Sequence, residues 1–354
     1  MSEELHPQEQ AIEEEDELHI GCSICGNSDI EDSYQLALCT NCREKLIKRP
    51  LPVWVKGIFV LMAILFIVAI TRFPSTFKAG IAFERGMRAE ASGKYLTAMK
   101  EYKVVTDRFP NSTLSLARLF ISTYNNGSVS EAYEIFKKIA GRNPKDQSIV
   151  TEVNGTIDRI EKMYFTSDEL GKILNEHQND KSDQLVTLLK KFLSNNPGDV
   201  QASYYLSDIL FDQKKYDEAE LIMSKIIETN PDFYEGYLFM AAIYRQKGDF
   251  EKAQESCKVV IEHNSENSSA YASLAKVLLK SHEDDKGLEM AKKAYEINQN
   301  DPSVLATLSL AYHYNNLTKE RDDMFNQLKK QYKDDTYDLN FLNGIFSNKE
   351  KWRD

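Results

Sequence analysis

Four cysteines near the start of the chain are the residues best suited to chemistry. They form two Cys-x-x-Cys pairs, Cys22/Cys25 and Cys39/Cys42, with thirteen residues between the pairs. Two such pairs allow four thiolates to converge tetrahedrally on one metal ion, each pair forming a tight turn around it. Gly26 suits such a turn because glycine tolerates a positive φ. The spacing therefore predicts a metal site formed by all four cysteines.

These pairs resemble the zinc-ribbon family over residues 21–46. The resemblance implies a structural zinc ion whose four ligand positions are filled, which leaves no open position for a catalytic water. Two disulfides are the alternative if the segment is exported. An iron site as in rubredoxin is disfavoured, since that family carries glycine after both pairs and Arg43 follows the second pair here. A thioredoxin-like redox pair would need a surrounding βαβ pattern, which the sequence lacks.

A long apolar run follows the cysteines and predicts a single transmembrane helix over residues 51–72. Gly57–Thr71 contains no charged residue, and Lys56, close to Trp54, can extend its ammonium group to the lipid interface. Twenty helical residues are enough to cross a bilayer core of about 30 Å. A buried soluble helix would be apolar all round in an otherwise amphipathic protein, and a cleavable signal peptide would lie at the extreme N-terminus. Both alternatives are disfavoured.

Basic residues flank the predicted span on both sides. Five lysines and arginines precede its uncharged part within about 15 positions if Lys56 is counted, and four follow within a similar distance, beginning with Arg72. A reducing compartment would also keep the cysteine thiols free to bind metal. Both observations favour a membrane protein with a cytoplasmic N-terminal head and an extracytoplasmic C-terminal region.

The rest of the chain repeats a pattern of two short amphipathic helices every 34 residues. The clearest unit is 234–267, where apolar residues at helical spacing lie on both sides of a break at Gly248. Steps of 34 residues from Ala253 lead to Ala219 on one side and to Gly287 on the other. Small residues at these positions let the paired helices approach closely.

This pattern resembles the tetratricopeptide repeat, whose first helix carries an aromatic, a Leu, a small residue and a Tyr. The resemblance implies an all-α fold, a TPR-type helical solenoid, with two units at 79–146 and four at 200–335. Residues 147–199 are too long for one unit, which predicts an irregular helical segment with a degenerate repeat. Residues 336–354 are predicted to form a C-terminal capping helix that covers the last apolar face.

In tetratricopeptide arrays the first helix of each unit lines a concave groove that binds a protein or peptide partner. The alternative for each such residue is simple contact with the next unit. By register, the resemblance assigns nine residues to the groove: Tyr204, Asp208, Phe211, Leu238, Arg245, Lys276, Leu279, His313 and Tyr314.

Composition and missing motifs narrow the function. The net charge of −11 argues against a nucleic-acid partner, because neutralising phosphates requires a basic face. Part of this acidity lies in residues 1–20, which are predicted to be a disordered tail. The six histidines are scattered, and the sequence contains no phosphate-binding glycine loop and no nucleophile elbow. These features favour a binding protein and not an enzyme.

Three functional hypotheses follow from these modules. The leading one is a single-pass membrane scaffold or adaptor for an envelope-associated protein complex, with a structural zinc ion in its head. The second is a membrane-bound electron carrier, in which the cysteines hold iron and the repeats dock a redox partner. The third is a regulatory membrane protein that couples the zinc-ribbon-like head to the repeats.

Overall fold

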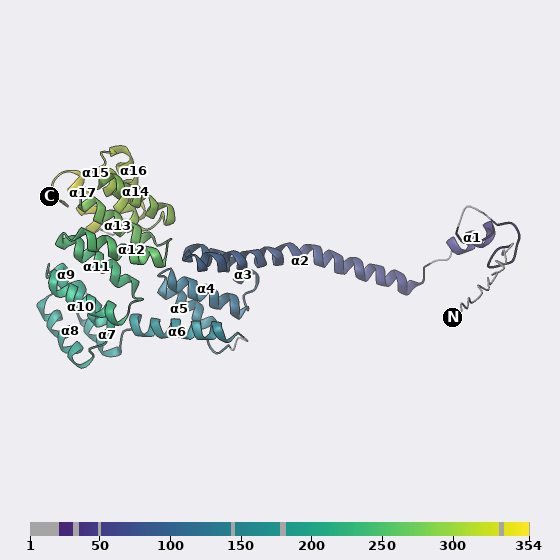
Figure 1. Cartoon of the computed structure of the whole chain (residues 1–354), viewed down its shortest axis with the longest axis horizontal. Coiled ribbons are helices and arrows are strands. Elements are labelled where there is room, and N and C mark those ends of the chain that lie inside the picture. Colours follow the sequence, from purple (N-terminus) through teal and green to yellow (C-terminus); the bar gives the residue numbers. More distant parts are fainter. Residues whose placement is uncertain are drawn as a thin grey trace, which may run out of the picture. The chain divides into compact units, whose positions relative to one another are not determined.

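The fold is all-α. A computed structural model describes residues 21–30, 35–48, 51–142, 146–177, 182–332 and 336–353, and no strand occurs among them (Figure 1). The predicted fold class, an all-α solenoid of the TPR type, is confirmed. The predicted acidic tail, 1–20, lies outside the described residues. The chain divides into two compact units, with the boundary after residue 74.

The first unit contains the cysteines in a short stretch with one helix, α1 (Thr40–Ile47). This helix begins between the two cysteines of the second pair, because the Cys39 sulfur caps its N-terminus and accepts a hydrogen bond from the backbone N–H of Cys42 at 3.5 Å. Among the described residues of this stretch, 21–30 and 35–48, the buried core is very small: it consists of Cys22, Leu38 and Cys39. In the described residues, the resemblance to zinc ribbons is therefore confined to the two turns that carry the cysteines.

The next helix, α2 (Val53–Ala91), has 39 residues. Its apolar part has exposed side chains: the most apolar window of 18 residues has a mean hydropathy of 2.7, and none of it is buried. Among the described residues, α2 is the one helix long and apolar enough to cross a bilayer. Its final part is different, because Ala79, Ala82 and Ala89 are buried, and Ala89 forms a core cluster with Ala98 and Tyr102.

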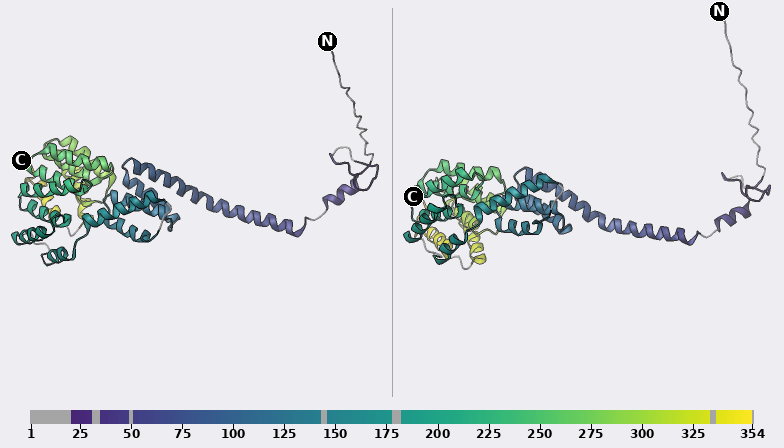
Figure 2. Two further views of the ribbon diagram at one scale, coloured as in Figure 1. Left: turned by 60° about the horizontal axis from the view of Figure 1, so that its bottom comes forward. Right: turned by 90° about the horizontal axis from the view of Figure 1, so that it is seen from below.

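The second unit is a series of paired helices in which most helices pack on the next, and α17 packs on α15 (Figures 1 and 2). The helices are α3 (Tyr95–Arg108), α4 (Thr113–Asn125), α5 (Val129–Ile139), α6 (Gln147–Tyr164), α7 (Asp168–Glu176), α8 (Asp183–Asn195), α9 (Val200–Asp212), α10 (Tyr216–Thr229), α11 (Tyr234–Lys247), α12 (Phe250–His263), α13 (Ser268–Lys280), α14 (Asp284–Ile297), α15 (Pro302–Tyr314), α16 (Thr318–Gln331) and α17 (Thr336–Phe346).

The repeated small residues lie where neighbouring helices touch. Ala219 and Ala253 are fully buried, and a Cβ at Gly287 would lie 2.8 Å from the Leu279 side chain. The turns follow local chemistry as well. Gly248 ends α11 in the left-handed conformation, with φ of 80°, and the Asn267 side chain caps α13 by accepting from the Ala270 N–H.

The segment between the two phased blocks contains α6, α7 and α8. With 18 residues, α6 is longer than the 11 to 14 residues of the repeat helices around it, and α7 has only 9. α6 packs against α4 on one side and α9 on the other, so it connects the two blocks of repeats. α8 buries Leu185, Leu189 and Phe192, the apolar residues that suggested a degenerate second helix.

Candidate metal centre and partner-binding groove

The four cysteine sulfurs converge on one point. All four Sγ atoms lie within 4.8 Å of one another, and those of Cys25 and Cys39 are 3.6 Å apart. A tetrahedral zinc ion with Zn–S bonds of about 2.3 Å would hold its sulfurs about 3.8 Å apart. The first pair is shaped by a turn in which the Gly26 N–H donates to the Cys22 carbonyl at 2.8 Å and Gly26 has φ of 72°. The four cysteines can bind a metal ion with little rearrangement.

The thiols of this cluster differ in acidity. Backbone N–H groups of Cys39 and Ile24 stabilise the Cys22 thiolate, which lowers the pKa of Cys22 to about 6. The pKa of Cys42 is raised to about 12, mainly by its hydrogen bonds to the Cys25 and Cys39 sulfurs. Four thiolates at these distances repel one another strongly. A cation at their centre would remove that repulsion, so the donor set fits a divalent metal ion.

Two of the nine predicted groove residues lie between neighbouring units. The Tyr204 ring centroid is 5.4 Å from that of Phe239 and 5.9 Å from that of Phe233, and the Phe211 centroid is 5.4 Å from that of Phe239. Phe233 caps the start of α11 and Phe239 belongs to α11. Tyr204 and Phe211 therefore pack against the next unit, as the alternative interpretation predicts.

The charged groove residues are half-buried on three successive first helices. Asp208 lies on α9, Arg245 on α11 and Lys276 on α13. Burial lowers the pKa of Arg245, and the Lys276 ammonium donates to Ser303 Oγ at 3.2 Å. Both signs of charge are therefore present on these helices.

The groove residues near the end of the array are covered by the chain itself. Leu279 is fully buried, with its side chain against Gly287 of α14. The His313 ring centroid lies 5.1 Å from that of Phe346 in α17. The Tyr314 ring is covered by Trp352 and by the Arg353 guanidinium. Sequence reasoning missed Trp352 and Arg353, because they lie outside the repeated pattern.

The first repeats also contact the loop that joins α12 to α13. The backbone N–H and the hydroxyl of Thr97 donate to the Glu266 carboxylate at 2.8 and 2.6 Å. The Ser265 N–H donates to the Gly93 carbonyl at 2.9 Å. Gly93 has φ of 63°, and a Cβ there would lie 2.8 Å from the His263 carbonyl oxygen. We call these contacts the closure contact, because they join segments about half the chain apart.

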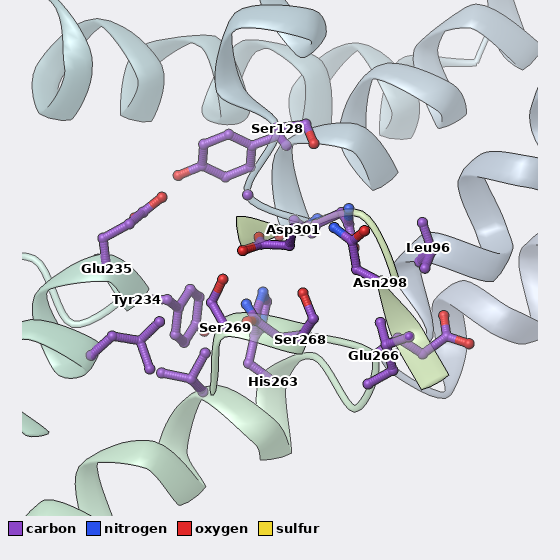
Figure 3. Close-up of a pocket in the computed structure, with 18 of the residues that line it drawn as sticks. Leu96, Ser128, Tyr234, Glu235, His263, Glu266, Ser268, Ser269, Asn298 and Asp301 are labelled. Carbon is purple, nitrogen blue, oxygen red and sulfur yellow. The ribbon is translucent and has the colours of Figure 1, made fainter. Parts of the chain in front are cut away.

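A polar cavity of about 600 Å³ lies beside the closure contact. It was not predicted, because its lining comes from six separate segments of the chain, most of them loops and helix ends. Figure 3 shows Tyr234, Glu235, His263, Ser268 and Asp301 around it; Leu238, a predicted groove residue, is also in the lining.

Burial disfavours the charged forms of two groups in this cavity. The pKa of Glu235 is raised by burial, although the carboxylate accepts a hydrogen bond from the Tyr164 hydroxyl. The pKa of His263 is lowered to about 4, first by burial and then by Arg159. The His263 ring stacks on Tyr234 with centroids 3.8 Å apart, and its Nε2 has no hydrogen-bond partner among the residues that the structure describes.

Comparison with protein families identifies the repeats. A tetratricopeptide repeat model matches residues 183–232, which cover α8 to α10, and a second tetratricopeptide repeat model matches residues 234–267, which cover α11 and α12. No curated protein matches the chain. Residues 183–267 thus contain tetratricopeptide repeats, and the class that the fold defines is a helical repeat protein.

Several solved structures are similar to part of the chain. The crystal structure of MamA is 20% identical, with a TM-score of 0.38, and the match covers 48% of this chain and 96% of that one. A tetratricopeptide repeat protein from Parabacteroides merdae is 14% identical, with a TM-score of 0.42 and coverages of 76% and 98%. YrrB, described as a TPR protein with an unusual peptide-binding site, is 18% identical, with a TM-score of 0.32 and coverages of 46% and 82%.

Proposed function

We propose that this protein is a non-catalytic, membrane-anchored scaffold whose repeats bind a protein or peptide partner in an envelope-associated complex. The observation that carries the proposal is the combination of tetratricopeptide repeats at 183–267 with the exposed apolar part of α2. The proposal keeps the division made from the sequence: a head at 21–46, a span at 51–72 and repeat units from 79 to a C-terminal cap at 336–354.

The head is proposed to hold one structural zinc ion at Cys22, Cys25, Cys39 and Cys42. Its support is the convergence of the four sulfurs within 4.8 Å. Zinc would fix the two turns relative to each other and would leave no site for substrate. Metal analysis of the purified full chain tests this: we expect one zinc per chain and no visible absorption. A red chromophore with one iron per chain would instead favour the electron-carrier hypothesis.

The span is proposed to place the head in the cytoplasm and the repeats outside it. This orientation rests on the slight excess of basic residues before the span and on the need of metal-binding thiols for a reducing compartment. Protease added to intact cells should remove the repeats and leave the head protected. Release of the full chain by alkaline carbonate would contradict membrane insertion, and protection of the repeats would reverse the orientation.

Partner binding is proposed to use the charged residues of successive first helices. Half-buried Asp208, Arg245 and Lys276 supply both signs of charge, which suits a partner with alternating charges. Cross-linking and affinity capture with the full chain in membranes should recover a protein that is lost with Arg245→Glu. Exposed Lys225→Glu on α10 is the matched control. Absence of any captured protein, together with enzymatic turnover by the purified chain, would overturn the scaffold proposal.

A further inference from the structure

The residues after α17 turn back onto the array. Asn348 adopts a left-handed conformation with φ of 57°, and the N–H groups of Lys349 and Glu350 donate to the Gly344 carbonyl at 2.8 and 3.1 Å. This reversal brings Trp352 and Arg353 to the C-terminal ends of α13 and α15. We call residues 347–353 the return segment.

The guanidinium group of Arg353 is bound both along its edge, by hydrogen bonds, and on its flat face, by an aromatic ring. Its two Nη atoms form a bidentate ion pair with the Asp284 carboxylate, one of the two distances being 2.9 Å. Nη1 also donates to the Leu279 carbonyl at 2.7 Å. The flat face of the guanidinium lies 3.8 Å from the centroid of the Tyr314 ring. A lysine could not reproduce this arrangement, because it lacks the planar fork of donors.

Trp352 fills the position next to this arginine. Its ring centroid lies 5.8 Å from that of Tyr314, and the Lys280 Nζ is 5.5 Å from the centroid of the Trp352 ring. The same ammonium donates to the Trp352 carbonyl oxygen. Lys351, by contrast, is exposed. The return segment is therefore held mainly through one aromatic–arginine pair.

The site that holds this pair borders the groove assigned by register, since it uses the Tyr314 ring and the backbone carbonyl of Leu279, whose side chain is buried against Gly287. Leu279 and Tyr314 are two of the nine predicted groove residues, and Lys280 adjoins the first of them. The return segment has no helix of its own and reaches this surface through two side chains and one carbonyl. It binds at this end of the groove in the way expected of a short bound peptide, with an anchor in a charged and aromatic pocket.

We propose that Asp284, Tyr314 and the Leu279 carbonyl form an arginine-recognition site of the groove, which the return segment fills in cis. The partner that takes its place presents an arginine beside an aromatic side chain. This inference rests on the proposed function, because it specifies the partner chemistry of the same groove. Binding of the partner then requires that Trp352 and Arg353 leave the site.

The test measures binding of a labelled peptide with the sequence of residues 349–354 to the full chain. We expect the W352A/R353A variant to bind the peptide at least about tenfold more tightly than the unaltered chain, because its site is empty. Adding Asp284→Asn should weaken that binding at least about tenfold, and so should an arginine-to-lysine change in the peptide. Asp285→Asn, on the exposed neighbour, and Lys351→Ala are the matched controls and should leave binding unchanged.

Several results would overturn the inference. They are absence of peptide binding to W352A/R353A, equal binding to that variant and the unaltered chain, or indifference to Asp284→Asn in variants that still unfold cooperatively. If the unaltered chain forms a dimer in which each return segment fills the site of the other copy, the segment does not act in cis and the proposal is wrong. If capture of the membrane partner survives in W352A/R353A/D284N, the scaffold function stands and the arginine site alone is refuted.

Discussion

The head and the repeats of this chain are stabilised in different ways. In the part of the head that the structure describes, the buried core consists of Cys22, Leu38 and Cys39, and two of these three are candidate metal ligands. In the repeats, large buried clusters follow one another along the array, and they include fully buried side chains such as Phe120 and Leu210. So small a core cannot offset the conformational entropy of the head without an ion, whereas stacked repeats stabilise one another. We therefore expect each region to unfold independently of the other.

The largest expected effect is loss of the metal. Cys22→Ser should abolish stoichiometric metal binding and unfold residues 21–48, because structural zinc sites supply the folding free energy of such small domains. The thermal unfolding of the repeats should not change. Metal content and amide hydrogen exchange measure the two effects.

The fifth cysteine provides the control for that experiment. Cys257 lies fully buried in α12, and burial raises the pKa of its thiol to about 12, so it stays protonated at neutral pH. Cys257→Ser should leave the metal content intact and should destabilise the repeats by about 1–3 kcal/mol, since it buries a hydroxyl in an apolar site. Loss of metal in this variant would contradict the separation of the two regions.

A cavity in the repeat core should produce the next largest effect. Phe120 is 0% exposed, so Phe120→Ala should lower the free energy of unfolding of the repeats by about 3–5 kcal/mol. Leu221 is 60% exposed, and Leu221→Ala should change it by less than about 0.5 kcal/mol. Chemical denaturation gives both values, and metal content should be unchanged in both variants. A similar loss of stability in the two variants would show that the core does not determine the stability of the repeats.

The closure contact should contribute less to the free energy of unfolding of the repeats. Alanine substitutions at two glycines separate this contribution from the cost of backbone strain. Gly93 and Gly127 have φ of 63° and 85°, but only at Gly93 would a Cβ meet another segment, the His263 carbonyl at 2.8 Å. Gly127→Ala should lower the free energy of unfolding by about 1 kcal/mol, because alanine is strained in a left-handed backbone conformation. Gly93→Ala should cost about 1–2 kcal/mol more, because it also disturbs the closure contact. Faster amide exchange at Ser265 in Gly93→Ala, but not in Gly127→Ala, would confirm this reason; equal effects would refute it.

The smallest expected effect is a dependence of repeat stability on pH through His263. Its pKa is lowered to about 4 in the folded protein from 6.5, so below pH 6.5 the unfolded chain binds more protons. The stabilisation of the folded repeats by neutral His263 is fully present above pH 6.5 and is lost as the pH falls toward 4. The ring keeps partial contact with solvent, so we expect a loss of about 1 kcal/mol after discounting for screening.

The pH experiment compares the unaltered chain with His263→Gln. The raised pKa of Glu235 acts with the opposite sign, since protonation at low pH favours the folded state for that group. The comparison removes this contribution, because Glu235 is present in both proteins. Melting temperatures between pH 7.5 and pH 4.5 should fall more steeply in the unaltered chain. Parallel curves would show that His263 does not contribute.

The sequence by itself determined the features that depend on local spacing. The two cysteine pairs predicted that four sulfurs meet, and the 34-residue period predicted the paired helices and the buried positions of Ala219 and Ala253. These predictions succeed because a turn or a helix face is defined by residues close together in the chain. The register likewise assigned residues to the first helix of each unit.

Only the tertiary structure decided which of these helix faces are covered. Thr97 and Glu266 are 169 positions apart, and no period in the sequence relates them. Tyr314 satisfies the groove register, yet Arg353 covers it after a chain reversal at Asn348. The repeat pattern specifies contacts between successive units, whereas the curvature summed over many units decides which distant segments meet. The closure contact and the polar cavity depend on that sum, and the arginine site depends on the chain reversal after α17.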